Sequence, residues 1–277
     1  MISASAKKEI ESGDRFAFGA NWGRFLESLS DERIVRAEES LRSMLETERL
    51  DGLRFLDAGS GSGLFSLAAR RLGATVCSFD FDSQSVACTA EVKRRYFPDD
   101  SRWEVDYGSV LDSDYLARLG EFDIVYSWGV LHHTGDMWRA MENVADCVDH
   151  GGRLFVALYN DQGRKSRGWA KIKRMYNEHA WLRPLLLGYG IARAWTLTTV
   201  LDFYELKPFA SWRAYHRERG MSPWWDLVDW IGGSPYEFAT PEAVFRFYRD
   251  RGFVLQNLVT RQGYGCNEFV FVKRGET

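Results

Sequence analysis

Residues 53–63, with the sequence LRFLDAGSGSG, constrain the fold of this chain more than any other segment. An apolar run ends there in Asp57 and passes into a loop that contains Gly59, Gly61 and Gly63, and a helical pattern follows over residues 64–72. This order predicts a strand, a glycine turn and a helix. Glycines let the backbone approach a ligand closely, and the first N–H groups of the helix point toward it.

A second acidic residue, Asp80, follows the next apolar run, residues 74–79, seventeen positions after Gly63. A carboxylate at the end of a second strand can accept hydrogen bonds from both hydroxyls of a ribose. The two motifs together indicate a site for a nucleoside cofactor with an anionic end. A dinucleotide fold, the alternative, expects G-x-G-x-x-G, whereas the spacing here is G-x-G-x-G and Leu64 stands at the sixth position.

Three more apolar runs predict strands over residues 103–105, 122–126 and 152–159. The apolar residues within 137–148 recur at helical spacing, and Thr134 is a suitable N-cap before them. Apolar runs that alternate with helical patterns indicate a parallel sheet covered on both faces.

The sequences DAGSGSG, FDIVYSWGVLHH and GGRLFVALYN follow one another in this order. They resemble motifs of the class I S-adenosylmethionine (SAM) dependent methyltransferases, broadly of the quinone-biosynthesis and small-molecule type, and the resemblance covers residues 53–159. It implies an α/β, Rossmann-like fold: a seven-stranded, mostly parallel sheet with a helical insertion. A helix beginning at Thr240 and Pro241 and strands over residues 253–260 and 268–272 would complete this sheet, with the final strand antiparallel.

The resemblance also places a set of residues around SAM. Those expected at its amino-acid end are Asp57, Gly59, Ser60, Gly61 and Gly63. Those expected along the rest of the cofactor are Asp80 (ribose), Phe81, Ser109 and Val110 (adenine), and Ser127 and Trp128 (sulfur). Ser109 departs from the family, which often has an aspartate there, and Asp106 or Asp112 could compensate.

Methyl transfer from a sulfonium is an in-line displacement, so such an enzyme mainly aligns the acceptor, the methyl carbon and the sulfur. A hydroxyl acceptor also needs a base. His132 and His133 are the catalytic candidates because they follow the fourth predicted strand at its carboxyl end, where ligands bind in such sheets. One of them is expected to face the site and the other to pack against the next helix. The chemistry requires no metal, and no metal-ligand spacing is apparent in the sequence.

Another set of residues is expected to contact the acceptor: Trp22, His216, Tyr264, Asn267 and Glu268. Trp22 belongs to an aromatic, glycine-bearing segment, residues 15–26, which is either a lid over the site or an apolar plug over the sheet. Tyr264, Asn267 and Glu268 lie in or beside the turn between the last two predicted strands, which is either part of the site or an ordinary hairpin.

We divide the chain into an N-terminal helical lid (1–50), a SAM-binding core (51–159), an aromatic, basic helical insertion (160–239) and a C-terminal segment that completes the core sheet (240–277). The insertion holds seven of the eleven tryptophans, and residues 161–220 carry twelve Lys/Arg against five Asp/Glu. It is interpreted as several helices broken near Pro184, Pro208 and Gly220. It either packs its aromatic side chains as a subdomain or, as we favour, forms a substrate cap.

A net charge of −3 over 277 residues argues against general nucleic-acid binding. The four cysteines show no zinc or disulfide spacing, the first residues carry no secretory signal, and no apolar run is long enough to span a membrane. These features favour a cytoplasmic monomer or homodimer. Peripheral membrane contact through the basic, apolar insertion is a further expectation.

The sequence therefore predicts a methyltransferase that uses SAM to O-methylate a small or lipid-like metabolite. The alternatives are an N- or C-methyltransferase, a tRNA wobble-base modifying enzyme with the same core, and a non-catalytic SAM-binding module. The basic insertion favours the tRNA alternative, whereas the acidic total opposes it. A dehydrogenase is the least compatible with the glycine spacing.

Overall fold

A seven-stranded sheet in the order β3-β2-β1-β4-β5-β7-β6 organises the structure, a computed structural model that describes residues 26, 29–205, 207–208, 210–211, 223–261 and 265–275. Its strands are β1 (Arg54–Ala58), β2 (Thr75–Asp80), β3 (Trp103–Tyr107), β4 (Phe122–Trp128), β5 (Val148–Tyr159), β6 (Phe253–Val259) and β7 (Cys266–Lys273). Strands β1 to β5 are parallel, and β7 runs antiparallel to both of its neighbours. The predicted sheet, including its antiparallel final strand, is confirmed.

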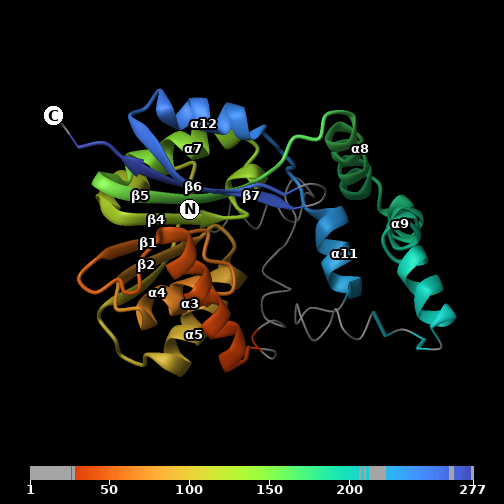
Figure 1. The fold of residues 1–277 in the computed structure, drawn as a ribbon, viewed down its shortest axis with the longest axis horizontal. Helices are drawn as coiled ribbons and strands as arrows, with labels where there is room; N and C mark the ends of the chain where they lie inside the picture. Colours follow the sequence, from red (N-terminus) through yellow and green to blue (C-terminus); the bar gives the residue numbers. More distant parts are fainter. Residues whose placement is uncertain are drawn as a thin grey trace.

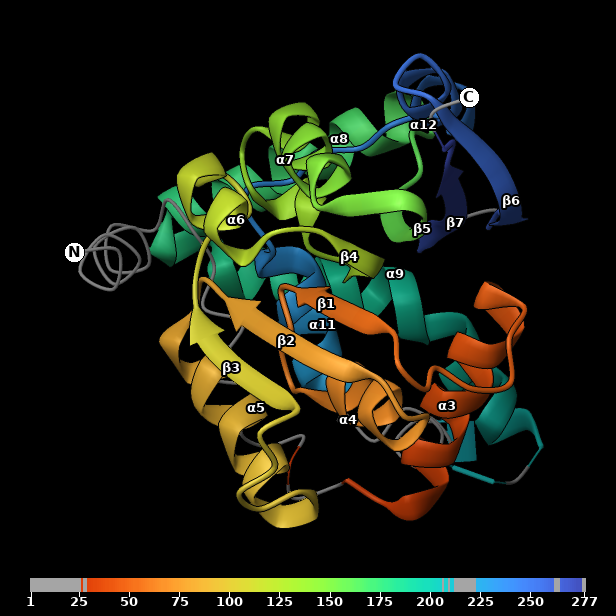
Figure 2. The ribbon, with the colours of Figure 1, turned by 90° about the vertical axis from the view of Figure 1, so that its left-hand side faces the viewer.

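Helices cover both faces of this sheet, as Figure 1 shows from the side and Figure 2 after a quarter turn. One face carries α3 (Asp31–Leu45), α4 (Leu64–Arg71) and α5 (Ser83–Tyr96). The other carries α6 (Ser113–Leu119), α7 (Met137–Asp146) and α12 (Pro241–Arg249). Each face therefore buries its own apolar cluster.

Strand β1 illustrates why the sheet is buried on both sides. Phe55 packs with the cluster beneath α3–α5, whereas Leu56 and Ala58 pack with the cluster beneath α7 and α12, and all three side chains are fully buried. Successive side chains of a strand point to opposite faces, so a continuous apolar run supplies both clusters. Asp57 lies on the same face as Phe55, which directs its carboxylate toward α4.

The parallel strands all end at one side of the sheet, which we call the carboxyl edge. Their last residues there are Ala58, Asp80, Tyr107, Trp128 and Tyr159. Strand β7 begins at this edge because it is antiparallel, so its residues Asn267 and Glu268 pair with Leu158 and Ala157 of β5. The insertion lies beyond the carboxyl edge, to the right of the sheet in Figure 1.

Short polar side chains fix where two of the helices begin. Thr240 accepts a hydrogen bond from the Ala243 N–H and caps α12, as predicted. The prediction that Thr134 caps the helix after the fourth strand is wrong. Asp136 caps α7, while the Thr134 hydroxyl donates to the Leu131 carbonyl oxygen at 2.7 Å. Asp136 immediately precedes the first helical residue and can therefore satisfy an unpaired N–H of the first turn.

The insertion contains α8 (Arg164–Glu178), a short 3₁₀ helix η2 (Ala180–Leu182), α9 (Arg183–Tyr204) and α11 (Pro223–Gly232). It has its own apolar cluster, in which Trp169, Leu186 and Ile231 are buried. The predicted break near Pro184 is present, because η2 ends at Leu182 and α9 begins at Arg183, with Pro184 in its first turn, where no N–H is needed. Gly220 lies outside the described residues. No helix of the described ranges is long and apolar enough to cross a membrane.

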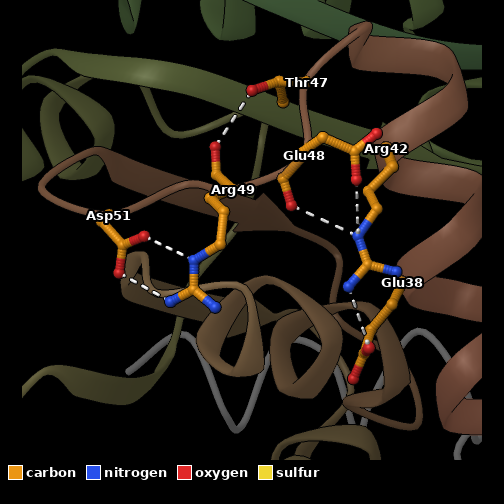
Figure 3. Close-up of polar contacts among 6 residues, drawn as sticks. All are labelled: Glu38, Arg42, Thr47, Glu48, Arg49 and Asp51. Atoms are coloured by element: carbon orange, nitrogen blue, oxygen red, sulfur yellow. Dashed lines mark hydrogen bonds and ion pairs between the residues drawn. The ribbon is translucent and has the colours of Figure 1, made fainter.

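A polar network shapes the connection from α3 to β1 (Figure 3). The Arg42 guanidinium donates to the Glu48 carbonyl oxygen at 3.2 Å and lies 3.5 Å from a carboxylate oxygen of Glu38. Arg49 pairs with Asp51 through two bonds of 2.6 and 2.9 Å. An exposed pair such as Arg49 and Asp51 contributes little to stability, so these contacts define the path of the loop more than they stabilise the fold.

Candidate active site

The glycine loop between β1 and α4 is held in one conformation by close packing. Gly59 and Gly63 have φ angles of +92° and +77°, a region that glycine adopts readily. A Cβ atom on Gly59 would lie 2.5 Å from the Val130 side chain, and one on Gly63 would lie 2.9 Å from the Thr89 Cα. The loop is therefore confined between α5 and the segment that follows β4, and only glycine fits at these two positions.

Asp80 ties this loop to the end of β2. One carboxylate oxygen accepts the Gly61 N–H at 2.9 Å, and the other accepts the Asp82 N–H at 2.8 Å. Desolvation raises the pKa of Asp80 to about 6, although the two N–H donors oppose this effect. The carboxylate that the sequence assigned to ribose thus lies beside the glycine loop at the carboxyl edge.

Asp57 starts a buried chain of hydrogen bonds that runs across the sheet. The Ser66 hydroxyl donates to its carboxylate at 2.5 Å and also bonds the Ser78 hydroxyl at 2.8 Å, which accepts the Trp103 indole N–H at 2.9 Å. Asp57 is only 2% exposed. Burial raises its pKa to about 7, against the hydrogen bond from Ser66, and the charge of Asp80 adds to the increase. Sequence reasoning missed the two serines, because their partnership depends on strand register.

The predicted adenine residues lie at the ends of β2 and β3. Phe81 is half-buried, and its ring centre is 6.4 Å from that of Tyr107, a residue that the sequence analysis did not select. The Ser109 hydroxyl accepts the Leu111 N–H at 3.2 Å, and Val110 is buried. The phenylalanine and the tyrosine together present aromatic surface next to Asp80.

Asp106 and Asp112, which could compensate for the absence of an aspartate at position 109, already accept hydrogen bonds from Tyr115. Asp106 accepts the Tyr115 hydroxyl at 3.1 Å, and Asp112 accepts the Tyr115 N–H at 2.9 Å as the cap of α6. Both carboxylates therefore hold the helix that follows β3.

Polar side chains also fasten the loop to its neighbours. The buried Ser127 hydroxyl donates to the Ala58 carbonyl oxygen at 2.8 Å, which joins the ends of β4 and β1. Ser60 and Thr89 share a hydrogen bond of 2.9 Å between their hydroxyl groups. Trp128 is exposed at the end of β4. Two of the predicted cofactor residues, Ser60 and Ser127, thus have a structural bond in addition to their expected role.

His132 and His133 have different surroundings. His132 is fully buried, and neither of its ring nitrogens has a hydrogen-bond partner within the described part of the chain. Burial, together with the nearby charges of His133 and Lys173, holds the pKa of His132 well below its ordinary value, so its ring is neutral. His133 Nδ1 lies 2.6 Å from the Pro235 carbonyl oxygen, which can only accept, so this nitrogen carries the proton.

The two histidines belong to a larger group that we call the histidine cluster: His132, His133, Tyr159 and Tyr236. The ring centre of Tyr159 is 4.0 Å from that of His132 and 5.2 Å from that of Tyr236. Tyr159 ends β5, and Tyr236 follows α11. The cluster therefore lies where the core sheet meets the insertion.

A small pocket adjoins the histidine cluster. It is lined by Tyr159, Asn160, Gln162, Lys165, Ser166, Trp169, Trp230, Tyr236 and Gly265. Lys173 lies behind this wall, almost fully buried, with its ammonium bonded to the Trp230 carbonyl oxygen and 4.7 Å from the ring centre of Tyr236. The pocket joins the carboxyl edge to α8 and α11, and the abundance of aromatic residues in the insertion was its sequence signal.

The predicted acceptor residues are only partly described. Trp22, His216 and Tyr264 lie outside the described residues. Asn267 is buried, and its side-chain oxygen accepts the Arg261 N–H at 2.9 Å. Glu268 is also buried, 3.7 Å from the Arg261 guanidinium. The four cysteines are free thiols, and the described residues contain no group of three or more His, Cys, Asp or Glu suited to a metal ion.

Comparison with known proteins gives consistent matches. A family described as methyltransferase domain matches residues 22–224. A ubiquinone biosynthesis O-methyltransferase of Rhizobium johnstonii is 33% identical over 174 residues, which is 57% of this chain and 68% of that protein. A Rhizobium etli protein of the same name is 37% identical over 174 residues, with the same coverage.

Among solved structures, magnesium protoporphyrin IX methyltransferase from Synechocystis PCC 6803 with bound S-adenosylhomocysteine (SAH) superimposes with a TM-score of 0.54. The match covers 92% of this chain and 94% of that chain at 15% identity. At this sequence identity, the superposition shows a shared fold and nothing beyond it.

The raised pKa of Asp57 gives a prediction about stability. Between its ordinary value of 3.8 and about 7, the folded protein holds a proton that the unfolded chain releases, so ionisation of Asp57 destabilises the fold as the pH rises through this range. Asp57→Asn should therefore raise the free energy of unfolding at pH 8 by on the order of 2–4 kcal/mol, and the gain should shrink toward pH 4. Urea unfolding of the ligand-free protein at both pH values measures this.

Asp100→Asn is the matched control, with the opposite sign. Although burial opposes the effect, the Arg102 N–H and the Arg70 guanidinium, 2.7 Å away, lower the pKa of Asp100. Its ionised form stabilises the fold, so this variant should unfold more easily at neutral pH. A loss of stability in Asp57→Asn at pH 8 would contradict the assignment of a costly buried carboxylate.

Proposed function

Because this chain belongs to the class I SAM-dependent methyltransferases, we propose that it transfers the methyl group to a hydroxyl of a small or lipid-like acceptor. The observation that carries this proposal is the arrangement of the carboxyl edge. The glycine loop and Asp80 lie at the ends of β1 and β2, while the histidine cluster and its pocket lie at the end of β5. Cofactor and acceptor would therefore meet near the end of β4.

The residues of this edge suit SAM. The glycine loop has no side chains at Gly59, Gly61 and Gly63, Asp80 offers carboxylate oxygens for ribose hydroxyls, and Phe81 with Tyr107 offers aromatic surface for adenine. When bound, SAM supplies a methyl group already activated by its sulfonium. The chain then has to align the acceptor, exclude water and remove a proton.

We assign proton removal to the histidine cluster. A neutral imidazole can accept a proton, and the lowered pKa of His132 keeps its ring neutral. In His133 the contact with Pro235 places the proton on Nδ1, which makes Nε2 the accepting nitrogen. His133 is also slightly exposed, whereas His132 is fully buried, so His133 is our first choice for the base and His132 for the residue that packs behind it.

The pocket beside Tyr159 is the proposed acceptor site, with the insertion as its cap. Tyr159, Trp169, Trp230 and Tyr236 give it aromatic walls, and Lys165 places a cation at it. These walls favour an acceptor with a flat or apolar body and an anionic group. The relatives named for ubiquinone biosynthesis support a hydroxylated aromatic amphiphile, and such compounds form the first acceptor panel.

Asp80→Ala should weaken SAH binding by one to two orders of magnitude, on the order of 1.5–3 kcal/mol, because a charge-assisted contact is lost. Binding to the unchanged protein should also weaken as the pH falls through about 6, where Asp80 takes up a proton. Calorimetric titration measures both effects. Asp250→Ala, at the exposed end of α12, is the control. Equal SAH affinity in the Asp80 variant would contradict the ribose assignment.

His133→Ala should lower turnover of a hydroxyl acceptor by roughly 10²–10⁴-fold while SAH affinity stays within twofold, because a general base is lost. His132→Ala should lower it less. Initial rates on the acceptor panel, with SAH titrations beside them, test this. Full turnover in both single variants would eliminate the histidines as the base.

Helix α9 supports peripheral contact with a membrane. Trp181 in η2 and Leu185 and Tyr204 in α9 expose 78%, 70% and 87% of their surfaces, and α9 also carries Arg183 and Arg193 against one acid, Asp202. Apolar surface of this extent beside two arginines suits the interface of an anionic bilayer, from which a lipid-like acceptor would be drawn. We therefore propose a cytoplasmic protein that visits a membrane surface through α9.

Replacing both Trp181 and Leu185 by serine should reduce sedimentation with phosphatidylglycerol vesicles at least fivefold, because two of the three most exposed large apolar side chains of the described residues are removed. Trp138→Ser, which replaces an exposed tryptophan of α7, should leave sedimentation unchanged. Phosphatidylcholine vesicles should bind less in every case. If the double variant instead converts a dimer into a monomer in light scattering, α9 serves association between two copies and the membrane proposal is wrong.

A further inference from the structure

The hydroxyl of Tyr126 is a buried polar group without a hydrogen-bond partner among the described residues. Tyr126 lies in β4 and is 3% exposed, and no hydrogen-bonding atom of the described ranges reaches its oxygen. A buried hydroxyl that forms no bond destabilises the fold, and such groups are rare in proteins. The arrangement is therefore explained most simply by a ligand that supplies the missing partner.

The ring of Tyr126 is fixed by three phenylalanines, so its hydroxyl occupies a defined place. The ring centres of Phe65, Phe155 and Phe55 lie 4.9, 5.1 and 5.8 Å away. Phe65 belongs to the first turn of α4, directly after the glycine loop. The hydroxyl is thus anchored near the loop that the structure provides for the cofactor.

The carboxylates of Asp57 and Glu268 lie near the Tyr126 hydroxyl. Asp57 is the register partner of Tyr126 across β1 and β4. Glu268 pairs with Ala157, which in turn pairs with Trp128, two residues beyond Tyr126 on β4. Burial, followed by the charges of Asp57 and Glu268, raises the pKa of the Tyr126 hydroxyl well above its ordinary value. The phenol therefore stays protonated and is a hydrogen-bond donor.

We propose that Tyr126, Asp57 and Glu268, here called the Tyr126 cluster, bind the zwitterionic amino-acid end of SAM. The Tyr126 hydroxyl donates to the α-carboxylate, and the carboxylates of Asp57 and Glu268 face the α-ammonium. This inference rests on the proposed function. It adds Tyr126 to the cofactor residues and moves Glu268 from the acceptor to the cofactor.

Charge complementarity supports this pairing. Asp57 and Glu268 are almost fully buried, and among the described residues Arg261, at 3.7 Å from Glu268, is the cation paired with either of them. An arriving ammonium would compensate Asp57, a carboxylate that is costly to bury, and would lie near a second carboxylate, Glu268. The α-carboxylate needs a donor at the same place, and Tyr126 supplies a hydroxyl that no group in the described part of the chain bonds.

Two ligands separate this contact from the rest of the site. SAH carries the amino-acid end, whereas 5′-methylthioadenosine has the same adenosine and a thioether but lacks the ammonium and the carboxylate. Tyr126→Phe keeps the ring and removes only the hydroxyl. Tyr248→Phe is the matched control, because Tyr248 is a fully buried tyrosine on the opposite face whose hydroxyl donates to the Met141 carbonyl oxygen at 3.4 Å.

Calorimetric titration of the full chain should show SAH binding at least tenfold weaker in Tyr126→Phe, with 5′-methylthioadenosine affinity within twofold. Glu268→Gln should behave in the same way, and Tyr248→Phe should leave both affinities unchanged. The ligand-free Tyr126→Phe protein should melt at the same or a higher temperature, because an unsatisfied group has been removed. If Tyr126 had only a structural role, its replacement would not leave the stability unaltered while weakening the binding of SAH alone.

Unchanged SAH affinity in Tyr126→Phe, or an equal loss for both ligands, would overturn the inference. If the unchanged protein binds SAH and Asp80→Ala weakens it while Tyr126→Phe does not, only the Tyr126 cluster is wrong. If the unchanged protein binds neither ligand, the proposed function fails together with this inference.

Discussion

The hydrogen bonds that join the glycine loop to the end of β2 are the interaction on which the rest of the site depends. The Gly59 and Ser60 N–H groups donate to the Phe79 carbonyl oxygen at 2.9 and 3.0 Å, and Gly61 donates to Asp80. These bonds set the direction in which α4 leaves the sheet. They thereby place Phe65 against Tyr126 and Ser66 against Asp57. Loss of the loop geometry would displace all of these contacts together.

The carboxyl edge is divided at the junction of β1 and β4, where the order of strands reverses. Such reversal points are where open α/β sheets bind ligands, because the helices on either side leave in opposite directions. Asp57 and Tyr126 face each other across this junction, and Ser127 closes it from the other face of the sheet. The glycine loop lies on one side of the junction and the histidine cluster on the other. Cofactor and acceptor therefore have separate supports within one sheet.

The features that depend only on residues close together in the sequence could be predicted from the sequence. The apolar runs fixed the strands because a sheet covered on both faces leaves no polar positions inside it. The glycine loop, Asp80 and the Thr240 cap were also readable from neighbouring residues. In contrast, the cap of α7 was assigned to Thr134 rather than Asp136, since both residue types cap helices and only the backbone decides between them. The contact that distinguishes His133 from His132 depends on Pro235, and one of the two charges near Tyr126 depends on Glu268, both more than a hundred positions away.

Strand β7 has a consequence for how this protein is made. It inserts between β5 and β6, so β5 keeps an unpaired edge until residues 266–273 have left the ribosome, more than a hundred residues after β5 itself. During that interval the insertion is synthesised next to an open edge, and open edges pair readily with other chains. An aromatic insertion with its own apolar cluster can collapse early and shield this edge. The tendency to aggregate and the need for a chaperone are therefore greatest in nascent chains that contain β5 but not yet β7.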